Sequence, residues 1–199
     1  IIKSLTLDPI TQGFSEYQTN LNSIQTVMSN SGESMGKVND AMLKLNNYSD
    51  QTIYNFSEMA RNIGTFTAAG VDLKTATSSI QGIANLAALS GSTSQQASTA
   101  MYQLSQAMSA GRVGLMDWNS VVNAGMGGKI FQTALAQTGV AMGTISKNAV
   151  DLGGKMGKLT INSDSFRNSI SAKAGGDSWL TGEVLTKTLS LLDGRLSIA

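Results

Sequence analysis

The acidic residues are the first candidates for chemistry, because the sequence contains no histidine and no cysteine. That composition excludes a thiolate zinc site and any nucleophile–base pair built from Cys or His. Acid–base catalysis by carboxylates needs acids that share a pocket. Asp164, Asp177 and Glu183 are instead scattered through a segment rich in Gly and Ser. We therefore expect solvated acids, with no catalytic, metal-binding or cofactor-binding residue and no enzyme activity.

The glycine-rich segment Gly125-Met126-Gly127-Gly128-Lys129 invites comparison with a phosphate-binding loop. Asn123 stands where that motif has its leading glycine, and Ile130 stands where it has the Ser or Thr that holds magnesium. The spacing therefore excludes the motif and predicts a break between two helices.

The composition narrows the classes of partner. Charged residues make up 14% of the 199-residue chain, below the roughly 25% of typical soluble domains. The net charge is +1 and no block of Lys and Arg is present, which argues against specific nucleic-acid binding. Apolar runs are far shorter than the about 20 residues that span a bilayer, and membrane contact is not indicated. The chain begins with Ile1 rather than Met, so we expect a fragment of a longer protein.

Apolar residues recur at helical spacing in successive blocks, which predicts a mainly α fold with little or no β structure. We expect short amphipathic helices packed in hairpins or a bundle. The expected segments are a lead-in (1–13), a heptad helix or hairpin (14–48), a helical core (49–138), a Gly-rich connector (139–165) and a C-terminal helical segment (166–199). The candidate helical core is Ile53, Phe56, Ile63, Ile80, Ile83, Met101, Leu104, Met108, Trp118 and Phe131.

A heptad rhythm runs through the second of these segments and defines a candidate self-association seam. Register kept over about four heptads is typical of a coiled coil. The alternative is a helical hairpin that turns at Ser31-Gly32, where glycine supplies a positive φ. The seam consists of Phe14, Tyr17, Leu21, Ile24, Met28, Met35, Val38, Met42 and Leu45.

Polar residues that precede the apolar stripes predict helix N-caps. One pair has capping-box spacing, in which a Gln side chain returns to the cap residue. The predicted caps are Ser49 or Asp50, Asp72, Ser92 or Thr93 with Gln95 or Gln96, and Asp117.

The pattern is weaker near the C-terminus. Glycines punctuate residues 139–165, where we expect a short helix over about 145–152 and a brief strand at Leu159–Ile161. A last helix is expected over 181–192, ended by Gly194.

No Asp, Glu, Lys or Arg occurs from Thr75 to Gly111. The stretch from Gly91 to Gly111 predicts a capped helix whose apolar side packs on neighbours and leaves Ser, Thr and Gln outside. Such a face has few groups that bind other surfaces tightly.

Several runs resemble one family in the same order along the chain. They are GFSEYQTNLNSIQTVMSN (13–30), the run from NYSDQTIYNFSEM to GGKIFQTAL (47–135), FRNSI (166–170) and WLTGEVLTKTL (179–189). Together they are similar to the N-terminal region of bacteriophage tail tape-measure proteins.

The resemblance implies a structural virion protein of a phage tail or a tail-like particle. Such proteins occupy the tail-tube lumen, set tail length, scaffold tube assembly and leave during DNA ejection. The implied partners are tail-tube and tail-tip or baseplate proteins, assembly chaperones and further copies of the chain, most plausibly three. The implied location is the tail lumen, and the host cytoplasm during assembly. The alternative is a helical domain of a tail-associated protein that degrades peptidoglycan or penetrates membranes.

Overall fold

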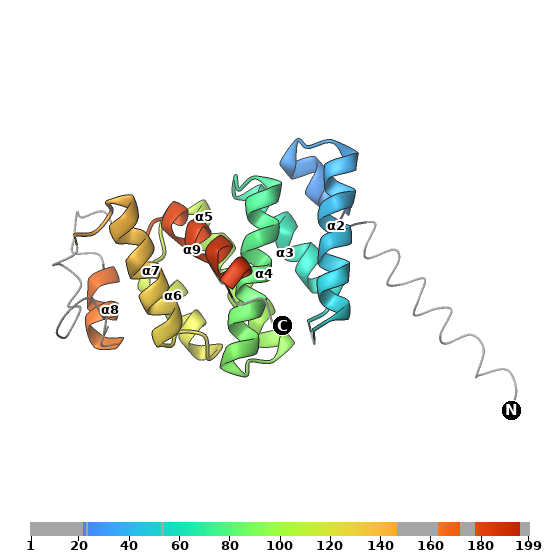
Figure 1. The fold of residues 1–199 in the computed structure, drawn as a ribbon. Helices are drawn as coiled ribbons and strands as arrows, with labels where there is room; N and C mark the ends of the chain where they lie inside the picture. The colour runs from blue at the N-terminus through green and yellow to red at the C-terminus, as the bar shows by residue number, and fades with distance from the viewer. Residues whose placement is uncertain (1–21, 23, 53, 147–162, 172–177, 196–199) are drawn as a thin grey trace, which may run out of the picture.

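A computed structural model describes residues 22, 24–52, 54–146, 163–171 and 178–195 (Figure 1). Residues 24–31 are helical, and no strand occurs in the described ranges, where Arg112 and Thr181 form an isolated β-bridge. The prediction of a mainly α fold is confirmed. The labelled helices are α2 (Met35–Asp50), α3 (Phe56–Ala68), α4 (Leu73–Ser90), α5 (Ser94–Ser109), α6 (Leu115–Asn123), α7 (Lys129–Met142), α8 (Ser163–Ile170) and α9 (Gly182–Arg195).

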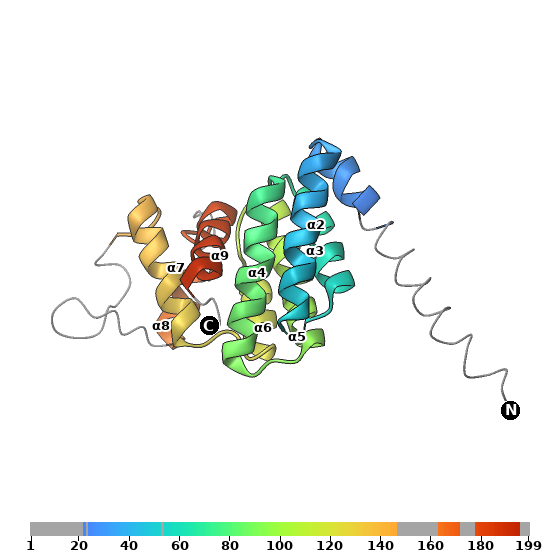
Figure 2. The same cartoon turned by 45° about the vertical axis from the view of Figure 1, so that its right-hand side comes forward.

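Helix α4 lies at the centre and packs against α2, α3, α5 and α9 (Figure 2). Its sequence has a single charged residue, Lys74 in the first turn, and most of its side chains are buried. Placing an unpaired charge in such an interior is very costly. Burial on several sides therefore explains why the first half of the uncharged stretch contains no charged residue.

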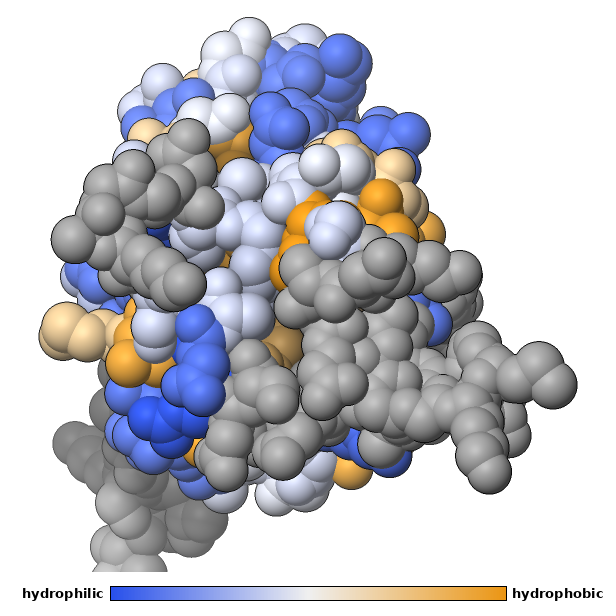
Figure 3. Space-filling model, turned by 90° about the vertical axis from the view of Figure 1, so that its left-hand side faces the viewer, coloured by the Kyte–Doolittle hydropathy of each residue, from blue (hydrophilic) through white to orange (hydrophobic). Residues whose placement is uncertain are grey.

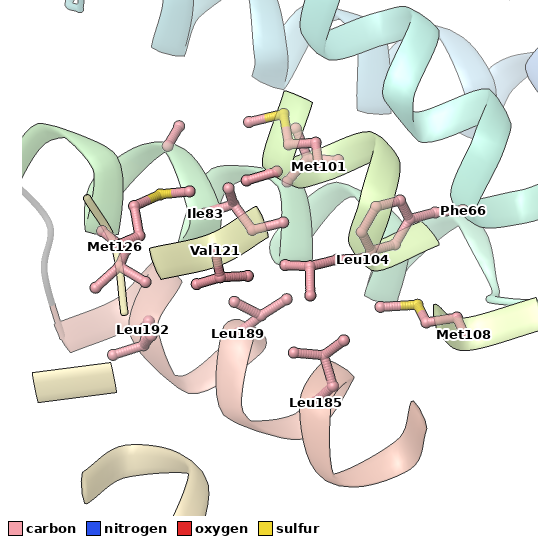
Figure 4. Close-up of a cluster of buried hydrophobic side chains, with 14 of the residues drawn as sticks. Phe66, Ile83, Met101, Leu104, Met108, Val121, Met126, Leu185, Leu189 and Leu192 are labelled. Carbon is pink, nitrogen blue, oxygen red and sulfur yellow. The ribbon is translucent and has the colours of Figure 1, made fainter. Parts of the chain in front are cut away.

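The closest helix contact joins α4 to α9. A Cβ atom added at Gly82 would overlap the carbonyl oxygen of Leu189 and lie 2.9 Å from its carbonyl carbon. This approach places Leu185, Leu189 and Leu192 against the core, where they face Ile83 and neighbouring side chains (Figure 4). The absent side chain of one residue thus sets the spacing of the two helices.

A buried polar chain accompanies this contact. The Tyr48 hydroxyl donates to Oδ1 of Asn85 at 2.6 Å, and Nδ2 of Asn85 donates to the Leu192 carbonyl at 3.5 Å. Burial, with Tyr54 and Asp193 nearby, raises the pKa of Tyr48 well above its usual value, so the hydroxyl stays a neutral donor. The polar atoms of α4 therefore link α2 to α9.

The start of α9 is held by backbone hydrogen bonds of the β-bridge. The Val113 N–H donates to the Leu180 carbonyl at 2.9 Å, and the Gly182 N–H donates to the Gly111 carbonyl at 3.1 Å. These bonds connect the last helix to the loop between α5 and α6.

Two predicted N-caps are confirmed. The Asp72 carboxylate accepts from the Thr75 N–H at 2.9 Å. Thr93 and Gln96 form a reciprocal capping box at the start of α5.

Two other predicted caps are wrong. Asp117 lies inside α6, where its carboxylate accepts from the Gly114 N–H at 2.8 Å, so Gly114 is the cap residue. Ser49 and Asp50 end α2, and α3 begins after Asn55, whose side chain accepts from the Ser57 N–H at 2.8 Å. Both errors place a capping side chain a few residues from the true start, which spacing alone does not resolve.

Of the glycines near the C-terminus, Gly143 interrupts the helical pattern as predicted, whereas Gly194 does not. Helix α7 passes through Gly139 and ends at Gly143, whose φ is +76°. Helix α9 passes through Gly194, so the prediction that this glycine ends the helix is wrong. Glycine costs only about 1 kcal/mol inside a helix, and packing overcomes that cost. The expected strand at Leu159–Ile161 lies outside the described residues, as does most of the helix expected over 145–152.

The N-terminal segment is the hairpin rather than the continuous helix. Residues 24–31 are helical, Gly32 has a φ of +63°, and α2 begins after Ser34, which caps it. The chain reverses here because glycine adopts the left-handed conformation at little cost.

We expect Gly82→Ala to lower the free energy of unfolding by about 1–3 kcal/mol, because the new methyl group forces α9 away from α4. Gly36→Ala is the matched control, since Gly36 is also helical but exposed, and it should leave stability unchanged or raised by up to about 1 kcal/mol. Urea unfolding followed by circular dichroism measures both. Equal midpoints for the two variants would contradict the proposed importance of this contact.

Candidate interaction surfaces

The three acids weighed for catalysis do not form a site in the described residues. Glu183 is exposed in the first turn of α9. Asp177 and the side chain of Asp164 lie outside what is described. Within the described ranges, no group of three or more His, Cys, Asp or Glu residues has a metal-binding arrangement.

The glycine-rich segment is a tight turn between α6 and α7. Gly125 has a φ of +78°, and a Cβ at Gly127 would lie 2.5 Å from Cγ2 of Val122. Nε2 of Gln132 donates to the Gly127 carbonyl at 2.7 Å. These contacts are packing between the flanking helices, in agreement with the predicted break.

The residues of the candidate seam do not share one exposed face. Val38, Met42 and Leu45 are buried within the chain, whereas Met35 is half exposed. Ile24 and Met28 are partly buried, and Val27 between them is fully buried. Phe14, Tyr17 and Leu21 lie outside the described residues. The reversal at Gly32 turns the second half of the rhythm into part of the core.

The candidate core residues that the structure describes lie together in one cluster. Phe56 is partly buried against that cluster, and Ile53 lies outside the described residues. The buried members are Ile63, Ile80, Ile83, Met101, Leu104, Met108, Trp118 and Phe131.

An aromatic cluster joins α6, α7 and α8 to the segment before α9. The Phe166 ring lies 4.6 Å from the Trp118 ring, between centroids, and 5.7 Å from Trp179 in an edge-on arrangement. Trp118 also contacts Phe131 at 5.8 Å. Trp179 lies against Gly139, where an added Cβ would come within 2.8 Å of its ring. The sequence predicts that Trp118 is buried, but it does not predict its association with Phe166, Trp179 or Gly139. The signal available in the sequence was a glycine within an apolar helical pattern.

Helix α5 supplies an exposed face without charge. Its outward residues include Gln95, Thr99 and Tyr102, and Gln106 donates to the Tyr102 hydroxyl at 2.9 Å. A shallow groove of about 280 Å³ lies between α5 and the end of α6, lined by uncharged side chains such as Thr93 and Asn123. Polar but uncharged groups therefore line this side of the molecule.

A groove of about 520 Å³ between α2 and the start of α4 is lined by both signs of charge. Lys37 pairs with Glu33 at 2.8 Å, and Lys44 pairs with Asp193 at 3.4 Å. The pairs are solvent-exposed and contribute little to stability. Charges of one sign are therefore not concentrated in this groove.

Apolar exposure is limited at the α7 end of the molecule. A groove of about 380 Å³ between α7 and α9 includes Met142 and Leu191, which are 40% and 41% exposed. In the space-filling view of this end, hydrophobic areas are separated by polar ones (Figure 3). Dispersed exposure of this kind is normal for a protein surface.

A groove of about 740 Å³ lies where α4 and α9 begin and includes Asp72 and Glu183. Burial opposes ionisation of Asp72, but hydrogen bonds from Thr75 and from backbone N–H groups hold its pKa below the usual value. The Asp72 carboxylate therefore serves as the N-cap of α4.

Asp72 should stabilise the fold only while it is ionised. A folded-state pKa below the unfolded value of 3.8 gives stability that is present above that pH and lost as pH falls through the folded pKa. Asn retains the cap but not the charge. We therefore expect the native chain to have a higher urea unfolding midpoint than Asp72→Asn at about pH 6. The difference between the two midpoints should shrink towards about pH 3. Asp40→Asn, at an exposed site outside any cap, is the control. A difference independent of pH would contradict this role.

Among the described residues, no helix has the length and apolar character needed to cross a bilayer. A family model described as tape measure protein matches residues 12–178. No curated protein and no solved structure matches the chain. The matched range covers most of the chain and ends before α9.

Proposed function

The chain belongs to the tape measure protein family, and we propose that it is a folded helical section of a protein that occupies the lumen of a phage tail tube. In this proposal the whole protein sets tail length, scaffolds tube assembly and leaves ahead of the DNA. The match over residues 12–178 is the observation that carries the proposal.

The described section is a docking section rather than a length of straight ruler. A helix advances about 1.5 Å per residue, so the full 199 residues would extend for roughly 300 Å as one helix. The longest helix in the part of the chain that the structure describes, α4, has 18 residues, which corresponds to about 27 Å. Repeated reversals and a shared core support a compact element at one end of the tail or on an assembly partner.

The proposed partners are tail-tube and tail-tip or baseplate proteins, together with assembly chaperones. Copies of the chain associate through the first part of the heptad rhythm, which comprises Phe14, Tyr17 and Leu21 with the partly buried Ile24 and Met28. Val38, Met42 and Leu45 do not take part, because they fill the core of their own chain. Three copies are the proposed number. The proposed location is the tail lumen, and the host cytoplasm during assembly.

A photo-crosslinking amino acid at Met116 should capture the tail-tube protein in assembled particles. Met116 is 85% exposed, so the substitution leaves the core intact. Mass spectrometry of the irradiated particles identifies the captured protein. The same variant expressed without the tube protein is the control. Particles that contain the chain but yield no tube or tip crosslink, from this site or from the exposed Tyr102, would contradict a lumen position.

The uncharged face of α5 should ease passage through the tube. We expect charges at Gln95, Gln103 and Gln106 to slow DNA ejection, because fixed charges pair with charges on the tube wall. Triple Glu and triple Lys variants test both signs, and triple Ala is the uncharged control. Surface substitutions of this kind change stability by only about 0.5 kcal/mol each, which thermal unfolding verifies. If neither charged variant slows ejection while both assemble, the uncharged face has another cause.

A further inference from the structure

Helix α8 is attached at the edge of the molecule, beside α7 (Figure 1). Two of its side chains, Phe166 and Ile170, are fully buried. Phe166 inserts between Trp118 and Trp179, and the Trp179 indole N–H donates to Oγ of Ser169 at 3.1 Å. We call the surface formed by Trp118, Phe131 and Trp179 the aromatic pocket. Among the described residues, the contacts of α8 are therefore concentrated at this pocket.

The rest of the molecule has its own closed packing. Helix α7 packs directly on α9, and α9 packs along α4. The pairing of α8 with α7 is among the smallest helix pairings in the described residues. Loss of α8 therefore leaves the helices around α4 in contact with one another.

One polar group in the aromatic pocket makes the docking of α8 less favourable. Nε1 of Trp118 is buried and has no hydrogen-bond partner among the described residues. A buried donor without a partner has lost its hydration without compensation. Because Phe166 lies against the Trp118 ring, removing α8 opens this side of the indole to water.

We propose that α8 is a detachable clip: it leaves the aromatic pocket as a unit while the helices around α4 stay folded. Eight residues are too few for a stable helix in isolation, so α8 unfolds when it detaches. Local units of this kind open at a lower free energy than the whole domain. The open state presents two tryptophans that the closed state covers.

The two tryptophans make this opening directly measurable. Trp118 and Trp179 are the only tryptophans in the sequence, and both contact Phe166. Fluorescence of this chain therefore reports α8 docking, whereas far-ultraviolet circular dichroism reports the remaining helices. In the native chain, we expect tryptophan fluorescence to become quenchable by acrylamide and to shift to the red as urea is added. Both changes should occur at a lower urea concentration than the loss of the helical circular dichroism signal. Hydrogen exchange in α8 should be at least about tenfold faster than in α4.

Phe166→Ala should give red-shifted, quenchable tryptophans without denaturant, with the helical unfolding midpoint close to that of the native chain. Phe56→Ala, a partly buried Phe in α3, is the matched control and should leave the fluorescence unchanged. Ser169→Ala removes two hydrogen bonds, the one accepted from the Trp179 indole N–H and the one donated to the Phe166 carbonyl. It should shift the fluorescence transition alone to lower urea concentration, which provides a test if Phe166→Ala does not fold. Coincident fluorescence and helical transitions in the native chain, or equal exchange in α8 and α4, would overturn the proposal.

Discussion

The contact between Gly82 and the Leu189 backbone is the constraint on which the remaining packing depends. It lets α9 lie directly on α4, which is also covered by α2, α3 and α5. A helix buried on so many sides needs its polar atoms satisfied internally. Asn85 meets this need by bridging Tyr48 and the Leu192 carbonyl, and Thr77 donates to the Leu73 carbonyl at 2.7 Å.

Helix α9 completes this core although it follows the part of the chain that matches the tape measure family model, residues 12–178. Its leucines fill the space beside α4, and the β-bridge fixes its start beside the α5–α6 loop (Figure 4). The folded core therefore includes residues beyond the matched range. The proposed clip lies just before α9 and contacts Trp179, so the last part of the chain combines the extensive packing of α9 on α4 with the small pairing of α8 and α7.

The uncharged stretch from Thr75 to Gly111 has two physical causes rather than one. In α4 the absence of charge follows from burial, as Ser79 and Gln81 in the interior illustrate. In α5 the apolar side packs inward, and the outward side carries Thr, Gln and Tyr that face water. Of these two surfaces, only the second is exposed. The sequence predicts the capped helix α5 with its polar outer face, but it does not show that α4 is the central helix.

Local patterns in the sequence determined the helices, the core residues on their stripes, and the caps at Asp72 and Thr93, because these depend on neighbours within a few positions. Tertiary structure decided what each face packs against. Periodicity marks Val38, Met42 and Leu45 as buried, but only the reversal at Gly32 directs them into their own chain. Likewise, the local sequence alone indicates only that Gly82 and Gly139 weaken the helices in which they lie. Each admits a distant group, Leu189 or Trp179, and a glycine within a helical pattern does not identify which remote segment approaches it.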